Sequence, residues 1–146
     1  PSTYDSISGE RRGVEDAAPC NIHPAFYLPH RKEKLMILDF DTIAANAVPH
    51  FKGGEGQAIV RKFDDPRMGA VVHLTLPVGA SIGLHTHTGN CEIIYVLSGS
   101  GRCIDDGTEY PVTAGMCHYC PEGHTHSIIN TGDTVLKLLG VLPVVK

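Results

Sequence analysis

Histidines are the residues of this sequence whose type and spacing most clearly favour chemistry. Six of the nine histidines lie between residues 73 and 126, and a single residue separates His85 from His87. Residues two apart in a strand face the same side of a sheet, so these two imidazoles are expected to project together. Histidine is the commonest metal ligand and acid–base group near neutral pH, but two alternate histidines alone fit a polar surface or core equally well.

A carboxylate and a third histidine complete a possible donor set. Glu92 opens an otherwise apolar run, where burial of a carboxylate is unfavourable unless a positive partner lies nearby. His126 follows a Pro-Glu-Gly turn at 121–123, and an antiparallel return would carry it toward the first pair. Three imidazoles and one carboxylate suit Fe²⁺, Mn²⁺, Ni²⁺, Co²⁺ or Zn²⁺ rather than Ca²⁺. An octahedral sphere would keep two open positions, as a catalytic metal requires.

Short strands must position these side chains. Sixteen glycines and ten prolines divide the 146 residues, 42% of them apolar, into short segments with no helical periodicity. Turn sequences such as Gly89-Asn90 and Asp106-Gly107 separate the segments and are typical of an antiparallel sandwich or barrel. We therefore predict one all-β domain. The predicted strands are Gln57–Phe63, Ala70–Leu76, Ile82–Thr86, Cys91–Leu97, Gly101–Ile104, Thr108–Val112, Met116–Cys120, His124–Asn130 and Thr134–Leu142.

The beginning of the chain differs from the rest in composition. Residues 1–34 are expected to form an arm that is partly flexible or contacts a partner subunit, and residues 35–146 a single barrel domain. Leu35–Phe40 is predicted to begin a strand, whereas Ala44–Val48 is too weak a pattern to assign.

Charge and hydropathy exclude several kinds of partner. Twelve Lys and Arg against sixteen Asp and Glu give a net charge of −4, which disfavours nucleic acid and anionic membranes. No apolar run approaches the roughly 20 residues of a membrane span. The polar start does not resemble a signal peptide, and five cysteines are an odd number, so we expect a reduced, cytoplasmic protein.

The spacing of these residues resembles the two sequence motifs of the cupins. The fixed positions of the first motif are matched by Gly79, His85, His87, Glu92 and Gly99. Those of the second are matched by Gly115, Pro121, Gly123, His126 and Asn130. The short spacing between Gly99 and Gly115 is typical of compact, single-domain bacterial cupins.

The resemblance implies a fold and a metal site. The fold would be a double-stranded β-helix, a jelly-roll-like barrel of two antiparallel sheets. One divalent transition metal (Fe, Mn, Ni, Co or Zn) per chain would be bound by His85, His87, Glu92 and His126. Cupins commonly pair through an N-terminal strand, so a homodimer is expected. His124 departs from the usual second motif, and it could be a fifth ligand, a substitute for Glu92, or a residue behind the ligands or at the rim. We favour the last because it follows the turn glycine.

Other polar residues are weaker candidates for a catalytic role. His118 and Tyr119 fall in a predicted strand that should border the site, and one of the two must face inward. His73 could line the cavity from another predicted strand, and Arg61 falls in a further one. Arg61 could bind a carboxylate through its guanidinium, although an exposed edge position is favoured narrowly. His73 fits a structural histidine at least as well.

The cysteines are expected to be structural. Cys117 and Cys120 form a C-x-x-C sequence, but strand residues three apart face opposite sides and no second pair exists to complete a zinc site. We therefore predict buried thiols, although Cys103, Cys117 or Cys120 could approach the cavity.

These features favour a mononuclear metalloenzyme that acts on a small oxygenated organic compound. Within the cupins, the chain resembles dioxygenases, which are oxidoreductases, and oxalate-decarboxylase-like proteins. Isomerases and lyases remain open, as do a small-molecule binding protein without turnover and a cupin whose metal is structural. Paired-carboxylate chemistry is disfavoured because Glu92 has no obvious second carboxylate.

Overall fold

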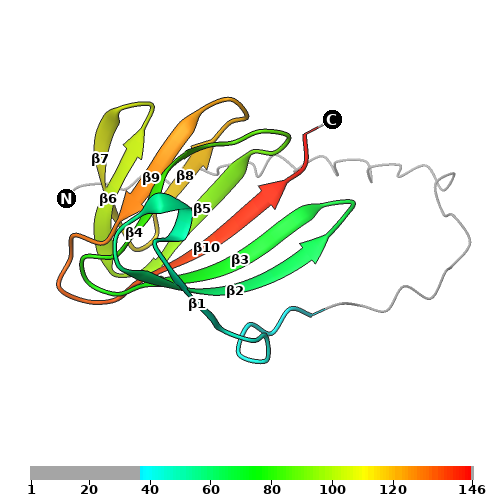
Figure 1. Cartoon of the computed structure of the whole chain (residues 1–146), viewed down its shortest axis with the longest axis horizontal. Coiled ribbons are helices and arrows are strands. Elements are labelled where there is room, and N and C mark those ends of the chain that lie inside the picture. Colours follow the sequence, from blue (N-terminus) through cyan, green and yellow to red (C-terminus); the bar gives the residue numbers. More distant parts are fainter. Residues whose placement is uncertain (1–36, 146) are drawn as a thin grey trace, which may run out of the picture. The chain divides into compact units, whose positions relative to one another are not determined.

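The computed structural model describes residues 37–145 (Figure 1). The predicted arm, residues 1–34, lies outside the described residues. Within residues 37–145, ten strands and one 3₁₀ turn follow one another. They are β1 (Asn46–Pro49), η2 (Phe51–Gly53), β2 (Gln57–Asp65), β3 (Gly69–Leu76), β4 (Ser81–Thr86), β5 (Glu92–Ser98), β6 (Ser100–Asp105), β7 (Thr108–Thr113), β8 (Cys117–Cys120), β9 (Thr125–Ile129) and β10 (Leu136–Pro143).

Two antiparallel sheets make up the fold. The larger sheet has the order β1-β2-β3-β10-β5-β8, and the smaller has the order β4-β9-β6-β7. In Figure 1 the strands fan out, with β7, β6 and β9 of the smaller sheet on the left and β5, β10, β3 and β2 of the larger sheet on the right. Neighbouring strands in space are often distant in the chain, as for β10 between β3 and β5. The predicted all-β, jelly-roll-like architecture is confirmed.

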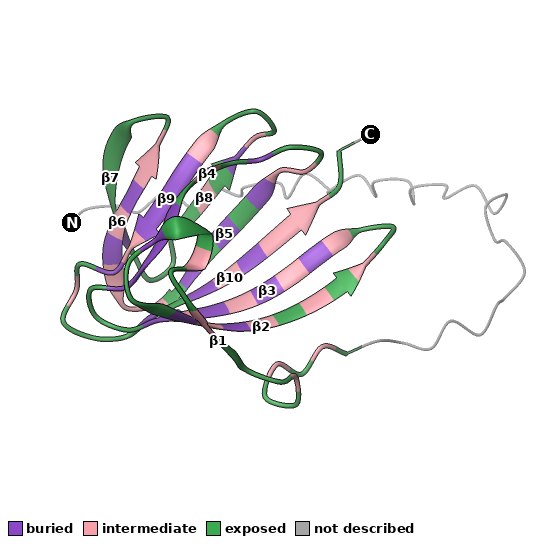
Figure 2. Cartoon of the chain, in the orientation of Figure 1, coloured by how far each residue is buried: buried purple, intermediate pink, exposed green. Residues whose placement is uncertain are grey.

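The core lies between the sheets and is built by alternation along the strands. On β3 the side chains of Val72, Leu74 and Leu76 are buried, while those between them are only half-buried. On β5 the pattern is sharper, because Ile94 and Val96 are buried and their neighbours are exposed (Figure 2). This period of two identifies the inner face of each strand.

Strand pairing brings the two motif regions together. In the smaller sheet His85 of β4 lies opposite His126 of β9, beyond an irregularity that follows Ile82. In the larger sheet Glu92 of β5 lies opposite Cys120 of β8. The histidine-rich strands and the glutamate-bearing strand thus belong to different sheets that share one core.

Each predicted strand from residue 57 onward is present, with ends that differ by at most two residues. The prediction for Leu35–Phe40 is wrong over residues 37–40, which form no strand. There the carbonyl oxygen of Asp39 accepts hydrogen bonds from the backbone N–H and the hydroxyl of Thr42, which turns the chain. Among residues 37–145, no helix has the length and apolar character needed to cross a membrane.

Candidate metal centre

Four donor side chains converge at one end of the core. His85 is near the end of β4, His87 follows that strand, Glu92 is the first residue of β5, and His126 lies in β9. One donor atom from each lies within 4.8 Å of the corresponding atoms of the other three. His87, Glu92 and His126 are buried, and His85 is half-buried at the cavity wall.

The separations between donor atoms match those of a metal site. His87 Nε2 lies 2.9 Å from His126 Nε2, and Glu92 Oε2 lies 3.2 Å from the first and 3.1 Å from the second. Ligand atoms about 2.1 Å from one ion and at right angles to each other are about 3 Å apart. A divalent transition metal therefore fits the three atoms together.

The other ring nitrogens have hydrogen-bond partners that leave the Nε2 atoms free to coordinate. His85 Nδ1 lies 2.9 Å from the carbonyl oxygen of Gly83, and His87 Nδ1 lies 2.7 Å from Oδ1 of Asn90. A carbonyl oxygen only accepts, so Nδ1 carries the proton in both rings and Nε2 presents a lone pair. Lone pairs and a carboxylate packed this closely repel one another without a cation, which favours metal binding.

Burial favours the neutral form of two imidazoles in this region, those of His85 and His118. It is the main cause that lowers the pKa of His85, and the positive charge of Lys52 lowers it further. Burial likewise lowers the pKa of His118, whose Nε2 lies 3.2 Å from His126 Nδ1. Neutral imidazoles are required for coordination, so both shifts favour a metal site at neutral pH.

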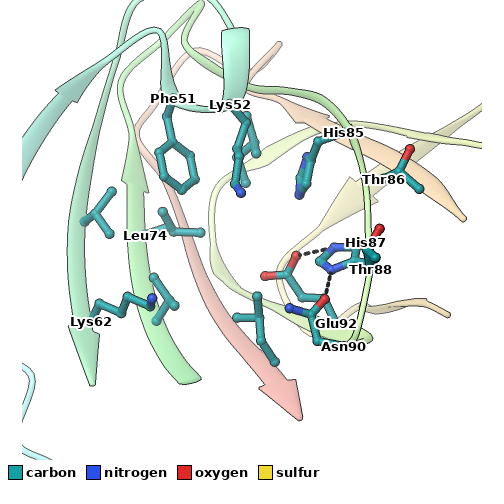
Figure 3. A pocket seen from close by; sticks show the side chains of 14 residues that line it. Phe51, Lys52, Lys62, Leu74, His85, Thr86, His87, Thr88, Asn90 and Glu92 are labelled. Atoms are coloured by element: carbon teal, nitrogen blue, oxygen red, sulfur yellow. Dashed lines mark hydrogen bonds and ion pairs between the residues drawn. The ribbon is translucent and has the colours of Figure 1, made fainter. Parts of the chain in front are cut away.

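A cavity of about 360 Å³ opens beside His85, His87 and Glu92. Its inner wall is apolar and includes Val72 and Leu74 of the larger sheet. Figure 3 shows Lys52 and Lys62 among its lining side chains, with the imidazoles opposite the apolar wall. The size suits a small molecule, and the donor cluster forms its polar end.

Three of the four predicted catalytic candidates do not reach this cavity. Arg61 and His73 lie opposite each other on β2 and β3, at positions that alternate with the buried Val60, Val72 and Leu74. They therefore project from the outer face of the larger sheet. Tyr119 is exposed on β8 and pairs with the exposed Ile93. Each of the three occupies an outward-facing position of its strand. For Arg61 this is the side that the sequence narrowly favoured, and for His73 it fits the structural role that was weighed against a place in the cavity.

His118 is the exception among the four candidates. It touches the ring of His126 on the side away from Glu92, and it also lines a second hollow of about 280 Å³. With Cys120 and His126 it forms a further group of donor atoms within 4.8 Å of one another. Its place is therefore behind a candidate ligand and outside the main cavity.

His124 lies apart from the four donors. Its side chain is exposed and pairs through Nδ1 with the carboxylate of Asp106, which also accepts a hydrogen bond from the backbone N–H of Thr125. The backbone carbonyl of His124 accepts a hydrogen bond from the N–H of His87. The structure thus places His124 at the rim, and its side chain does not join the donor group.

The cysteines of the described residues are free thiols in different environments. Cys103 and Cys120 are buried, and burial raises the pKa of Cys103 to about 12 and that of Cys120 to about 11. Cys117 is exposed, so the prediction of a buried thiol is wrong there. It lies on the outward phase of β8, opposite Tyr95.

Two residues near the donors, Asn90 and Lys52, are not among the site residues predicted from the sequence. Asn90 fixes the ring of His87, and its position three residues after that histidine was an available signal. Lys52 comes from η2, more than 30 residues before the first donor, and only the tertiary structure brings it to the cavity.

Comparisons with known proteins agree with this architecture. Residues 72–142 match the family model described as the cupin domain. An oxalate-binding protein of Thermotoga maritima is 32% identical over 112 residues, which cover 73% of this chain and 93% of that protein.

Solved structures give the same result. A predicted oxalate decarboxylase from Thermotoga maritima superposes with a TM-score of 0.72 and 31% identity, over 75% of this chain and 100% of that one. A sugar phosphate isomerase of the cupin superfamily from Silicibacter pomeroyi superposes with a TM-score of 0.61 and 25% identity. The match covers 75% of this chain and 76% of that one. The motifs, the two-sheet barrel and these matches together show that the chain belongs to the cupin family.

Proposed function

We propose that this cupin binds one divalent transition metal and uses it to capture a small oxygenated acid of the oxalate class. His85, His87, Glu92 and His126 would hold the metal, which is Fe, Mn, Ni, Co or Zn. One observation carries the proposal. Two histidine nitrogens and one carboxylate oxygen, from His87, His126 and Glu92, lie within 3.2 Å of one another at the end of a cavity. The two Thermotoga maritima relatives support the choice of ligand.

The chain's own residues would orient the metal-binding histidines and limit the space for the ligand. When bound, the metal would supply Lewis-acid coordination of ligand oxygens in its open positions. Asn90 and Gly83 would keep the rings of His87 and His85 oriented, and the apolar wall would limit the space beside them. Glu92 is the only carboxylate among the described residues that line the cavity. Because it is a metal ligand in this proposal, the cavity has no separate carboxylate to carry a proton, which favours capture over turnover.

Turnover is the second candidate. The 31% identity with a predicted oxalate decarboxylase supports it. A metal-loaded sample should then release formate and CO₂ from oxalate, or consume O₂ if the chemistry resembles that of dioxygenases. Stable binding of oxalate with neither result favours capture alone.

The first experiment compares two single-histidine variants. His85→Ala should lose most of the metal measured by elemental analysis of purified protein, because one donor of four is removed. His124→Ala is the matched control, since its exposed side chain lies outside the donor group, and it should retain the wild-type metal content. Equal metal in wild type and His85→Ala contradicts the proposed ligand set. Oxalate binding, measured by calorimetry, should disappear when a chelator removes the metal.

A homodimer in the cytoplasm is part of the same proposal. The outer face of the larger sheet exposes Ile93, Tyr95 and Leu97 in a row along β5 (Figure 2), and exposed apolar patches are typical of protein interfaces. The free thiols of the described residues support a reducing compartment. Sedimentation at micromolar concentration should give a dimer, and Tyr95→Glu should shift it toward monomer.

A further inference from the structure

We propose that Lys52 is the specificity-determining residue of the cavity and binds a carboxylate of a small dianionic acid. This inference rests on the proposed function and deepens it, because it names the charge class of the ligand. The lysine would bind ligand oxygens that face away from the metal donors, and so select dianions over monoanions and neutral compounds.

The first support is position. Lys52 lines the same cavity as His85, His87 and Glu92, although it comes from a different part of the chain. Figure 3 shows its side chain extending from η2 into the space beside His85, toward the open part of the cavity. A ligand held at the donor cluster would lie within reach of this ammonium group.

The second support is the way in which η2, the turn that carries Lys52, is fixed. His50 and Lys52 both adopt positive φ angles, 51° and 58°, which side chains other than glycine rarely take. His50 Nδ1 bonds to the carbonyl oxygen of Gly54 at 2.9 Å, which closes the turn, and the side chain of Phe51 packs against the core. An unfavourable backbone conformation persists only where surrounding contacts hold it, and such residues cluster at functional sites.

The turn is also held against β4. A Cβ atom on Gly83 would lie 2.1 Å from the carbonyl oxygen of Lys52, and one on Gly54 would lie 2.3 Å from that of Ser81. Ser81 Oγ accepts a hydrogen bond of 2.8 Å from the N–H of Glu55. The backbone that carries Lys52 is therefore fixed on the strand that carries His85.

The third support is charge. Among residues 37–145, no carboxylate lies within 4.0 Å of the Lys52 ammonium, whereas Lys62, across the cavity, pairs with Asp64 at 2.8 Å. Lys52 thus brings an uncompensated positive charge to the cavity. A divalent metal with Glu92 carries one net positive charge, so a ligand with two negative charges balances the metal site and Lys52 together.

The test measures oxalate binding by calorimetry on Mn²⁺-reconstituted protein, with acetate as the monoanion. Lys52→Ala should lower the affinity for oxalate about tenfold, which corresponds to about 1.4 kcal/mol, and change that for acetate much less. Lys52→Arg should stay within about threefold of wild type, because it keeps the charge. Lys137→Ala, the matched control, should change the affinity less than about twofold, since this exposed lysine of β10 does not line the cavity.

Metal content and circular dichroism, measured on every variant, separate ligand binding from folding and metal loading. The difference between wild type and Lys52→Ala should shrink from 50 mM to 500 mM salt. Equal oxalate affinity in wild type and Lys52→Ala overturns the role of Lys52 and leaves the proposed function standing. An equal loss in Lys137→Ala also overturns it, because oxalate affinity then depends on the total charge of the protein and not on a contact with Lys52. Wild-type protein that carries metal and binds no oxalate overturns both proposals.

Discussion

Oδ1 of Asn90 lies 2.7 Å from Nδ1 of His87, so the loop between β4 and β5 fixes the ring that faces Glu92. The two residues are three positions apart, and Asn90 is held in turn by an isolated bridge to Val144. Partners of this kind orient the ligand ring and determine which nitrogen keeps its proton.

Asn90→Ala should therefore weaken metal binding about 10- to 100-fold, as measured by competition with a metal-chelating dye. Asn90→Asp keeps an oxygen that accepts from His87 and should remain within a few-fold of wild type. If both variants bind metal as tightly as wild type, the hydrogen bond does not orient the ligand.

His118 is expected to act in the same way on His126. Its Nε2 lies 3.2 Å from His126 Nδ1, so His118→Ala should lower metal affinity about tenfold without removing a donor of the proposed set. The matched control is His73→Ala, which removes a histidine from the outer face of the larger sheet and should leave metal affinity unchanged. A loss of all metal in His118→Ala would instead indicate that His118 is itself a ligand.

The buried thiol of Cys103 should make stability depend on alkaline pH. Burial is the main cause that raises its pKa from 9.0 to about 12, so the folded state keeps the proton after the unfolded chain has lost it. The contribution of this thiol is complete below pH 9 and is lost as pH rises toward 12, with a slope of at most about 1.4 kcal/mol per pH unit.

Urea unfolding between pH 8 and 11 should show this decline, and Cys103→Ala should show a shallower one. At pH 8, iodoacetamide should modify the exposed Cys117 well before Cys103. Equal modification rates for the two thiols would contradict the burial of Cys103.

The close contact between η2 and β4 should make Gly83 intolerant of substitution. Gly83→Ala places a Cβ atom 2.1 Å from the carbonyl oxygen of Lys52 and 2.5 Å from the nitrogen of Gly54, so the turn must move. We expect a loss of about 2–3 kcal/mol in the free energy of unfolding measured with urea. Leu84→Ala, at an exposed neighbouring position, should change it by less than about 0.5 kcal/mol. A similarly small change in Gly83→Ala would show that the turn adapts.

The sequence by itself determined the strands, the family and the donor set proposed for the metal. Alternation of apolar residues and turn-forming glycines located every strand from residue 57 onward, because both signals are local. The motif spacing singled out His85, His87, Glu92 and His126, and the structure brings donor atoms of all four within 4.8 Å of one another.

Only the tertiary structure decided what surrounds those donors. Alternation shows which residues share a face but not which face is inside, so the sequence left open whether Arg61, His73 and Tyr119 border the cavity. The structure places all three on the outer face of the larger sheet. Lys52 reaches the cavity because a turn with positive φ angles packs backbone to backbone on β4, a contact that no local pattern encodes. The charge of the cavity, and with it the ligand class that we propose, follows from that long-range packing.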